Sequence, residues 1–176
     1  MKSLFASISL MAVLFSTSCS SSSNFANGTI DYGIVVSNIE KSVNFYKSIG
    51  FVEAATFEVP KEVTGDAGLL NYQKVKIHVM KLSGLDEGTS VKLMQTSGTH
   101  QKQNQQYIDS TYGMSYQTIF VHDMNIVLSA LKSNQIKVMA KGPVDLTPVG
   151  FAPNYLVCVR DPDGNIIEFV GPMPTK

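Results

Sequence analysis

The sequence predicts an α+β protein in which two tandem βαβββ modules pair into a curved, eight-stranded open barrel. Three observations predict this architecture. A strand–helix unit near the start of the chain recurs 85 residues later, each unit is followed by three more strand-like segments, and the chain closes on a β-hairpin. Each module alone would leave one face of its sheet uncovered, so we expect the two modules to pair and to wall a cavity between them.

The first module, about residues 29–97, opens on a strand and continues into an amphipathic helix. Asn38 is placed to cap that helix, Ile39, Val43 and Tyr46 follow at helical spacing, and Gly50 ends it. The strands predicted for this module are Ile30–Ser37, Phe51–Phe57, Val75–Leu82 and Ser90–Gln95, with loops at Gly65–Asn71 and Ser83–Gly88.

The second module, about residues 113–172, follows a polar, glutamine-rich boundary segment at His100–Ser110. Asp31 corresponds to Tyr116 and Asn38 to Asp123, so Asp123 takes over the capping role. The elements predicted here are a strand at Tyr116–His122, a helix at Met124–Asn134, a strand at Ile136–Ala140, a loop at Gly142–Pro153, and a hairpin that pairs Tyr155–Val159 with Ile166–Val170. The hairpin turn contains Pro-Asp-Gly-Asn, residue types that favour tight turns.

The first 28 residues are predicted to lie outside the fold. Residues 1–18 have a short basic start and an apolar stretch typical of a signal peptide, and Ser16-Thr17-Ser18-Cys19 is similar to a bacterial lipoprotein cleavage site. We therefore expect secretion across the inner membrane and lipidation of Cys19. The protein would then be anchored at the cell envelope, facing the periplasm or the exterior, with residues 19–28 as a tether and 173–176 as a tail. Ordinary secretion and a retained anchor are the alternatives.

Composition excludes one class of partner. Fourteen basic residues balance fourteen acidic ones in a chain of 176 residues, and no nucleic-acid-binding motif is present. We expect no nucleic-acid partner, and membrane contact through the lipid anchor alone. If Cys19 carries lipid, Cys158 is a single cysteine on a predicted strand and is expected to be a small buried side chain.

Two stretches resemble a known family. DYGIVVSNIEKSVNFYKSIGF (31–51) resembles the opening of the vicinal oxygen chelate superfamily, which includes glyoxalases, bleomycin-resistance proteins and extradiol dioxygenases, and VRDPDGNIIEFVGP (159–172) resembles its closing signature. The resemblance runs from Thr29 to Pro172 and implies a glyoxalase-like fold. It implies much less about function, because members of this superfamily include lyases, isomerases, dioxygenases, thiol transferases and non-catalytic binders.

The resemblance also implies four site positions, which fall on Asp31, Lys92, Tyr116 and Glu168. In metal-dependent members these positions hold one divalent ion, but a protonated lysine has no lone pair to donate. At about 5 Å from a dication, with an effective dielectric of about 20, an ammonium group is repelled by roughly 6–7 kcal/mol. We therefore expect a ligand-binding site without the metal, in which Lys92 pairs with Glu168 and also with Asp31. If a metal is present, Glu168 and Asp31 are the expected ligands.

Three functions from different classes follow. The first is a small-molecule-binding protein that uses the cavity between the modules and has no cofactor. The second is an enzyme, either a metal-dependent lyase or isomerase like glyoxalase I or a dioxygenase, with one divalent ion. The third is an interaction module with a vestigial cavity. A homodimer is compatible with each of them, and the sequence assigns no catalytic residue and names no ligand.

Overall fold

The computed structural model describes residues 29–85, 88–98, 100–101 and 105–175. The predicted signal peptide and the whole of the predicted tether, including Cys19, lie outside the described residues. The first module contains β1 (Tyr32–Val35), α1 (Ile39–Ser48), β2 (Phe51–Val59), α2 (Lys61–Asp66), β3 (Val75–Leu82) and β4 (Val91–Met94). The second contains β5 (Tyr116–Phe120), α3 (Met124–Ser133), β6 (Val144–Asp145), a 3-10 turn (Thr147–Val149), β7 (Asn154–Arg160) and β8 (Ile166–Pro172).

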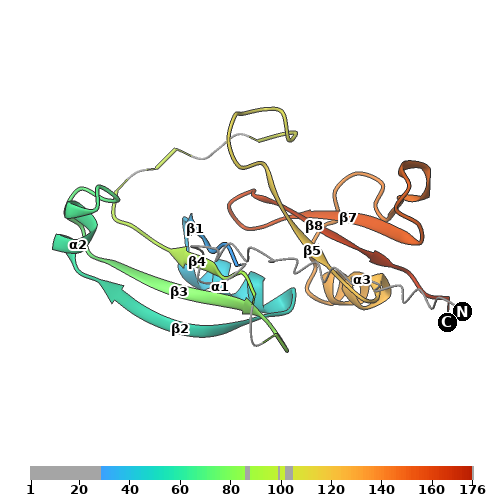
Figure 1. The fold of residues 1–176 in the computed structure, drawn as a ribbon, viewed down its shortest axis with the longest axis horizontal. Coiled ribbons are helices and arrows are strands. Elements are labelled where there is room, and N and C mark those ends of the chain that lie inside the picture. Colours follow the sequence, from blue (N-terminus) through green and yellow to red (C-terminus); the bar gives the residue numbers. More distant parts are fainter. Residues whose placement is uncertain (1–28, 86–87, 99, 102–104, 176) are drawn as a thin grey trace, which may run out of the picture.

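The predicted fold class is confirmed. The chain forms two four-stranded sheets with equivalent topology, β1-β4-β3-β2 and β5-β8-β7-β6. In each sheet the first and last strands of the module pair in parallel, and the other neighbours pair antiparallel. Figure 1 shows the two sheets following one another along the long axis of the molecule. The strands pair within each sheet, so hydrogen bonding between strands does not close a barrel.

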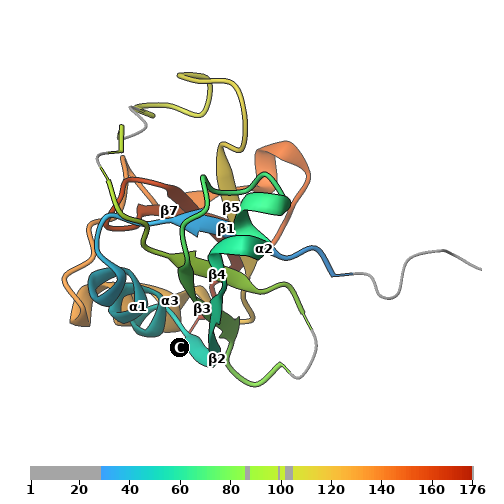
Figure 2. The ribbon, with the colours of Figure 1, turned by 90° about the vertical axis from the view of Figure 1, so that its left-hand side faces the viewer.

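Both helices begin where the sequence predicts. The Asn38 side chain accepts a hydrogen bond from the Lys41 backbone N–H, and the Asp123 side chain accepts one from Asn125 N–H. In Figure 2, α1 and α3 lie on the same side of β1 and β7. Their apolar faces join a single core that draws on both modules, including Tyr46, Leu93, Met124, Leu131, Val157 and Phe169.

Two local predictions are wrong. The chain between β2 and β3 forms a short helix, α2, that was not predicted. This helix extends into the predicted Gly65–Asn71 loop. The predicted strand Ile136–Ala140 makes only an isolated bridge, between Val138 and Val159. The fourth strand of the second sheet is instead β6, inside the predicted Gly142–Pro153 loop. Burying Val138 against the core satisfies the apolar pattern of 136–140 without a full strand ladder.

Hydrogen bonds connect the two modules at the level of the core. The Tyr32 hydroxyl donates to Gln117 Oε1 at 2.8 Å, and Gln117 Nε2 donates to the Tyr46 hydroxyl at 3.3 Å. Just before the start of α1, Asp163 of the β7–β8 turn accepts from the Ser37 backbone N–H at 3.1 Å. Asp161, only 5% exposed, accepts from two backbone N–H groups of the same turn. The predicted hairpin turn therefore also helps to dock one module against the other.

Residues alternate along each strand, so each sheet has a core face and an outer face. In the first sheet the pairs Tyr32–Val91 and Ile34–Leu93 face the core, and Gly33 and Lys92 lie side by side on the outer face. In the second sheet Gln117–Ile167 and Ile119–Phe169 face inward, and Thr118 lies beside Glu168 on the outer face. We call these surfaces the N-terminal and C-terminal outer faces. Among the described residues no helix is long and apolar enough to cross a membrane.

Candidate functional site

The N-terminal outer face carries an ion pair between Asp31 and Lys92. Asp31 comes just before β1, and Lys92 lies on the neighbouring β4, so the parallel pairing brings them together. Lys92 Nζ is 3.2 Å from Asp31 Oδ2, and the Ser90 backbone N–H donates to Asp31 Oδ1 at 2.7 Å. The Ser90 N–H, followed by Lys92, lowers the pKa of Asp31. Asp31 is therefore a carboxylate at neutral pH, and its charge is balanced by Lys92.

The C-terminal outer face carries Tyr116 and Glu168. Glu168 is half-buried on β8, and its Oε2 accepts a hydrogen bond from the Thr118 hydroxyl at 3.0 Å. Cys158 lies directly opposite Glu168 on β7. Burial and the nearby Glu168 charge raise the pKa of the Cys158 thiol. Tyr116 precedes Thr118 by two residues on the same face and is 46% exposed.

The structure places the four predicted site residues in two separate groups, Asp31 and Lys92 in the first module and Tyr116 and Glu168 in the second. Lys92 contacts Asp31, as one part of the prediction expected. The expected Lys92–Glu168 pair is not formed, because Lys92 is held by its own module and Glu168 by Thr118. In the described part of the chain, no hydrogen bond or ion pair crosses from Asp31 or Lys92 to Tyr116 or Glu168. The strands that carry the two sets approach one another where β1 nears β5, and there Tyr32 donates a hydrogen bond to Gln117.

A cavity of about 250 Å³ lies at that approach. It is lined by outer-face residues of both sheets, among them Gly33 and Val35 from β1 and Tyr116 and Ile166 from the second sheet. Gly33 is the register partner of Lys92, and Ile166 lies two residues before Glu168. The cavity therefore has a mixed lining, with apolar groups such as Val35 and polar groups such as Asn165, and it lies next to the strand positions of Lys92 and Glu168.

The residues at the four site positions do not fit a divalent metal ion. An ion held by Asp31 would need the position that the Lys92 ammonium occupies, 3.2 Å from the carboxylate. A neutral tyrosine is a poor ligand for such an ion, and lysine is none. Within the described segments there is no group of three or more histidine, cysteine, aspartate or glutamate residues arranged to hold a metal.

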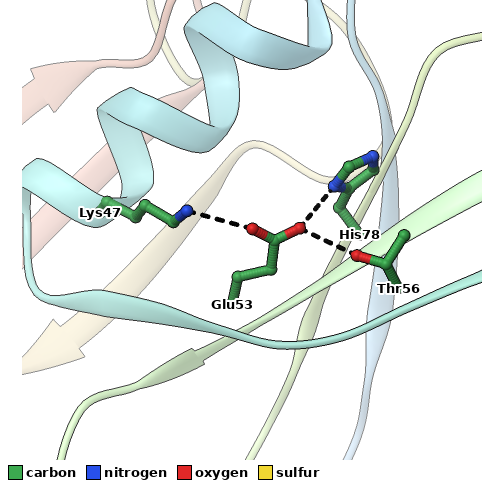
Figure 3. A network of polar contacts seen from close by, with 4 residues as sticks. All are labelled: Lys47, Glu53, Thr56 and His78. Atoms are coloured by element: carbon green, nitrogen blue, oxygen red, sulfur yellow. Dashed lines mark hydrogen bonds and ion pairs between the residues drawn. The ribbon is translucent and has the colours of Figure 1, made fainter.

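A second polar network was not predicted from the sequence. Glu53 on β2 lies between Lys47 at the end of α1 and His78 on β3, and Thr56 completes the group (Figure 3). Glu53 Oε1 is 2.7 Å from His78 Nδ1 and accepts from the Thr56 hydroxyl at 2.9 Å, and Glu53 Oε2 is 3.1 Å from Lys47 Nζ. These contacts, His78 first, lower the pKa of Glu53 to about 2.

Strand periodicity carries little signal for this network. The His78 side chain is 17% exposed and is held by Glu53. The register of β2 against β3 shifts between Glu53 and Ala55. Such an irregularity re-aims side chains, and here it places Thr56, and not Ala55, opposite His78, on the face that Glu53 shares through its pairing with Met80. Because a bulge is invisible in strand periodicity, the contribution of Thr56 could not be found from spacing alone.

Comparisons with known proteins identify the class of protein that this fold defines. The model of the Glyoxalase/Bleomycin resistance protein/Dioxygenase superfamily matches residues 29–169. The chain belongs to this superfamily, and the resemblance noted in the sequence is confirmed. A comparison with curated protein sequences found no match.

Solved structures agree on the fold. A glyoxalase family protein from Bacillus cereus is 17% identical and superposes with a TM-score of 0.70, covering 88% of this chain and 99% of that one. The trypanothione-dependent glyoxalase I of Leishmania major is 18% identical, with a TM-score of 0.54 and coverage of 83% and 87%. The antibiotic-binding protein TnmS3 from Streptomyces sp. CB03234 is 20% identical, with a TM-score of 0.54 and coverage of 83% and 96%. At these identities the likeness establishes the fold alone.

Proposed function

We propose that this protein binds a small molecule on its outer faces, around the cavity where β1 approaches β5, and that it does so without a resident divalent metal ion. The observation that carries the proposal is the Lys92 ammonium 3.2 Å from Asp31, at a position where metal-dependent relatives are expected to have a ligand. Small-molecule sites combine apolar lining with a few polar groups that fix the ligand. Here Tyr116 lines the cavity, and Asp31, Lys92 and Glu168 lie on or next to the strands that border it.

A binding role is favoured over a metal-dependent lyase or isomerase on chemical grounds. A metal-dependent enzyme needs an ion to polarise the oxygen of its substrate, and Lys92 opposes that ion by charge. The structural neighbours include both a glyoxalase I and an antibiotic-binding protein, so the fold itself is compatible with either function. The choice therefore depends on the residues of this chain.

The direct test is elemental analysis of the purified wild-type protein and of Lys92→Glu. The substitution replaces an ammonium group by a second carboxylate beside Asp31, which is a donor set suited to a divalent ion. After incubation with zinc, nickel or manganese and extensive dialysis, we expect less than about 0.1 equivalent of metal in the wild type and at least several times more in the variant. Stoichiometric metal in the wild type, removed only by strong chelators, would contradict the proposal.

The predicted location is part of the same proposal. A protein exported and lipidated at Cys19 would meet its ligand outside the cytoplasm, where a cytoplasmic thiol cofactor is absent. Radiolabelled palmitate should be incorporated into the full-length chain and not into Cys19→Ser, and the wild type should fractionate with membranes. Incorporation into neither protein, with all of the wild type recovered in the soluble fraction, would overturn lipidation.

A homodimer is also proposed. Large apolar side chains on β2, at the edge of the N-terminal outer face, are exposed, including Val52 at 46% and Phe57 at 45%. Exposed apolar surface of this kind marks interaction sites. Sedimentation velocity across a hundredfold concentration range should show a concentration-dependent dimer, and Phe57→Asp should weaken it. A monomer at all concentrations would exclude this part of the proposal.

A further inference from the structure

We propose that the C-terminal outer face binds an organic cation, with the Glu168 carboxylate as its counter-charge and the rings of Tyr116 and Phe120 as its aromatic walls. This inference rests on the proposed small-molecule function and names the chemical class of the ligand. Three features support it: a carboxylate with no cationic partner among the residues that the structure describes, two outer-face cations that are already engaged, and exposed aromatic rings on either side.

The first feature is the local environment of Glu168. Its side chain is half-buried on a central strand, and its protein partner is the neutral hydroxyl of Thr118 at 3.0 Å. No lysine, arginine or histidine of the described residues lies within ion-pair distance of it. A hydroxyl supplies one hydrogen bond but leaves the charge uncompensated, and a partly desolvated carboxylate in that state is costly.

The second feature is that two cations of the outer faces are engaged by other groups. Arg160 lies on the same face of β7 as Cys158, but its guanidinium donates to two backbone carbonyls, those of Gly164 at 2.6 Å and Gln106 at 2.8 Å. Lys92 is balanced by Asp31 within its own module. Neither neutralises Glu168, so the carboxylate is available to a cationic group of a bound molecule.

The third feature is the placement of the two rings. Tyr116, Thr118 and Phe120 occupy successive outer-face positions on β5, and Thr118 is the register partner of Glu168. Same-face neighbours on a strand lie about 7 Å apart, so the two rings flank the carboxylate at a distance that a small organic cation spans. Tyr116 is 46% and Phe120 77% exposed. Ammonium groups are attracted to aromatic faces, and this attraction adds to the carboxylate contact.

Size and chemistry further limit the ligand. The cavity of about 250 Å³ beside Tyr116 can take the apolar part of a small molecule while the cationic group reaches Glu168. Cys158, opposite Glu168, stays a neutral thiol because burial and the glutamate raise its pKa. It therefore acts as a wall of the site and provides neither a second charge nor a nucleophile. The ligand class is an aromatic or aliphatic amine or quaternary ammonium compound.

Three fluorescent probes of one shape test the charge preference. These are 1-naphthylmethylammonium, the neutral 1-naphthylmethanol and the anionic 1-naphthylacetate, titrated into the full chain at pH 7 and low salt. We expect the cation to bind about three- to tenfold more tightly than the alcohol, the range for a charge-assisted contact at a partly exposed site. The preference should shrink when salt rises from 50 to 500 mM, because added ions screen the carboxylate.

Variants test whether Glu168 is responsible for the preference for the cationic probe. Glu168→Gln keeps the shape of the side chain and should reduce the cation-to-alcohol ratio to about one, with alcohol affinity unchanged within twofold. Glu62→Gln, an exposed glutamate on α2, is the matched control and should leave the ratio as in the wild type. Phe120→Leu should weaken the cation and the alcohol together, with a larger loss for the cation.

The outcomes distinguish a failure of the cation site from a failure of the proposed small-molecule function. If the alcohol and the acetate bind as well as the ammonium, or if the preference survives in Glu168→Gln, the cation site is wrong and small-molecule binding stands. If none of the three probes binds at millimolar concentration, both proposals fail. If Glu168→Gln dissociates a dimer without changing probe selectivity, Glu168 is paired with a lysine of a second copy, which also overturns the cation site.

Discussion

Replacing Glu53 by glutamine should destabilise the fold by an amount that depends on pH. Glu53 links α1, β2 and β3 through Lys47, Thr56 and His78, and its pKa falls from 4.5 to about 2 because of those contacts. At 1.36 kcal/mol for each factor of ten, that fall corresponds to roughly 3 kcal/mol of stability. The side chain is 26% exposed, so solvent screening reduces the expected cost of Glu53→Gln to about 2 kcal/mol at pH 7.

The sign of the pH dependence follows from the direction of the pKa. A carboxylate whose folded pKa is depressed contributes fully above its unfolded pKa of 4.5, and the contribution is lost as pH falls toward 2. Urea unfolding followed by circular dichroism should therefore give a wild-type advantage of about 2 kcal/mol at pH 7 and about 1 kcal/mol at pH 3. Glu58→Gln on the same strand, where Glu58 is 61% exposed beside Lys74, should change stability by less than about 0.5 kcal/mol. A Glu53→Gln penalty below about 0.5 kcal/mol, or one independent of pH, would refute the reasoning.

Three further substitutions test close packing within each module and the β7–β8 turn. Gly171→Ala should cost about 2–4 kcal/mol in urea unfolding, because a Cβ there would overlap the Val121 carbonyl oxygen. Gly33→Ala should cost about 1 kcal/mol or less, because the close contact of its Cβ, at 2.9 Å, is with the flexible end of the Met94 side chain. Equal costs for the two would contradict this account. Asp161→Ala should cost about 3 kcal/mol, because it removes a 5% exposed acceptor and leaves the backbone N–H groups of the turn without a hydrogen bond. An effect under about 1 kcal/mol would mean that water takes the place of the carboxylate.

The repeated pattern allowed most of the fold to be predicted from the sequence. Helix caps are local chemistry, so Asn38 and Asp123 could be recognised from their side chains and from the apolar residues that follow. The β7–β8 hairpin could be recognised for the same reason, because its turn residues favour one backbone course. Segment 136–140 could not be recognised, because its apolar residues pack against the core without forming a strand ladder. An apolar pattern predicts burial, but it does not show which backbone hydrogen bonds form.

The candidate site was predicted in its residues and only partly in its contacts. Lys92 and Asp31 were expected near one another, and strand pairing within one module is enough to bring them together. A Lys92–Glu168 contact requires the exact placement of one module against the other. That placement depends on side-chain contacts such as Tyr32 with Gln117, and no periodicity encodes them. Local pairing can therefore be inferred from a repeat, and the geometry between repeats cannot.

The repeat also explains why the two outer faces differ in charge. Lys92 and Glu168 occupy equivalent places, each beside the first strand of its own module, but they carry opposite charges. The first module supplies Asp31, a full counter-charge, and the second supplies Thr118, a hydroxyl that donates a hydrogen bond and leaves the charge in place. The Asp31–Lys92 pair is therefore neutral, whereas Glu168 has no such counter-charge among the described residues. The two equivalent positions thus differ in charge balance, and charge complementarity directs a cation to Glu168.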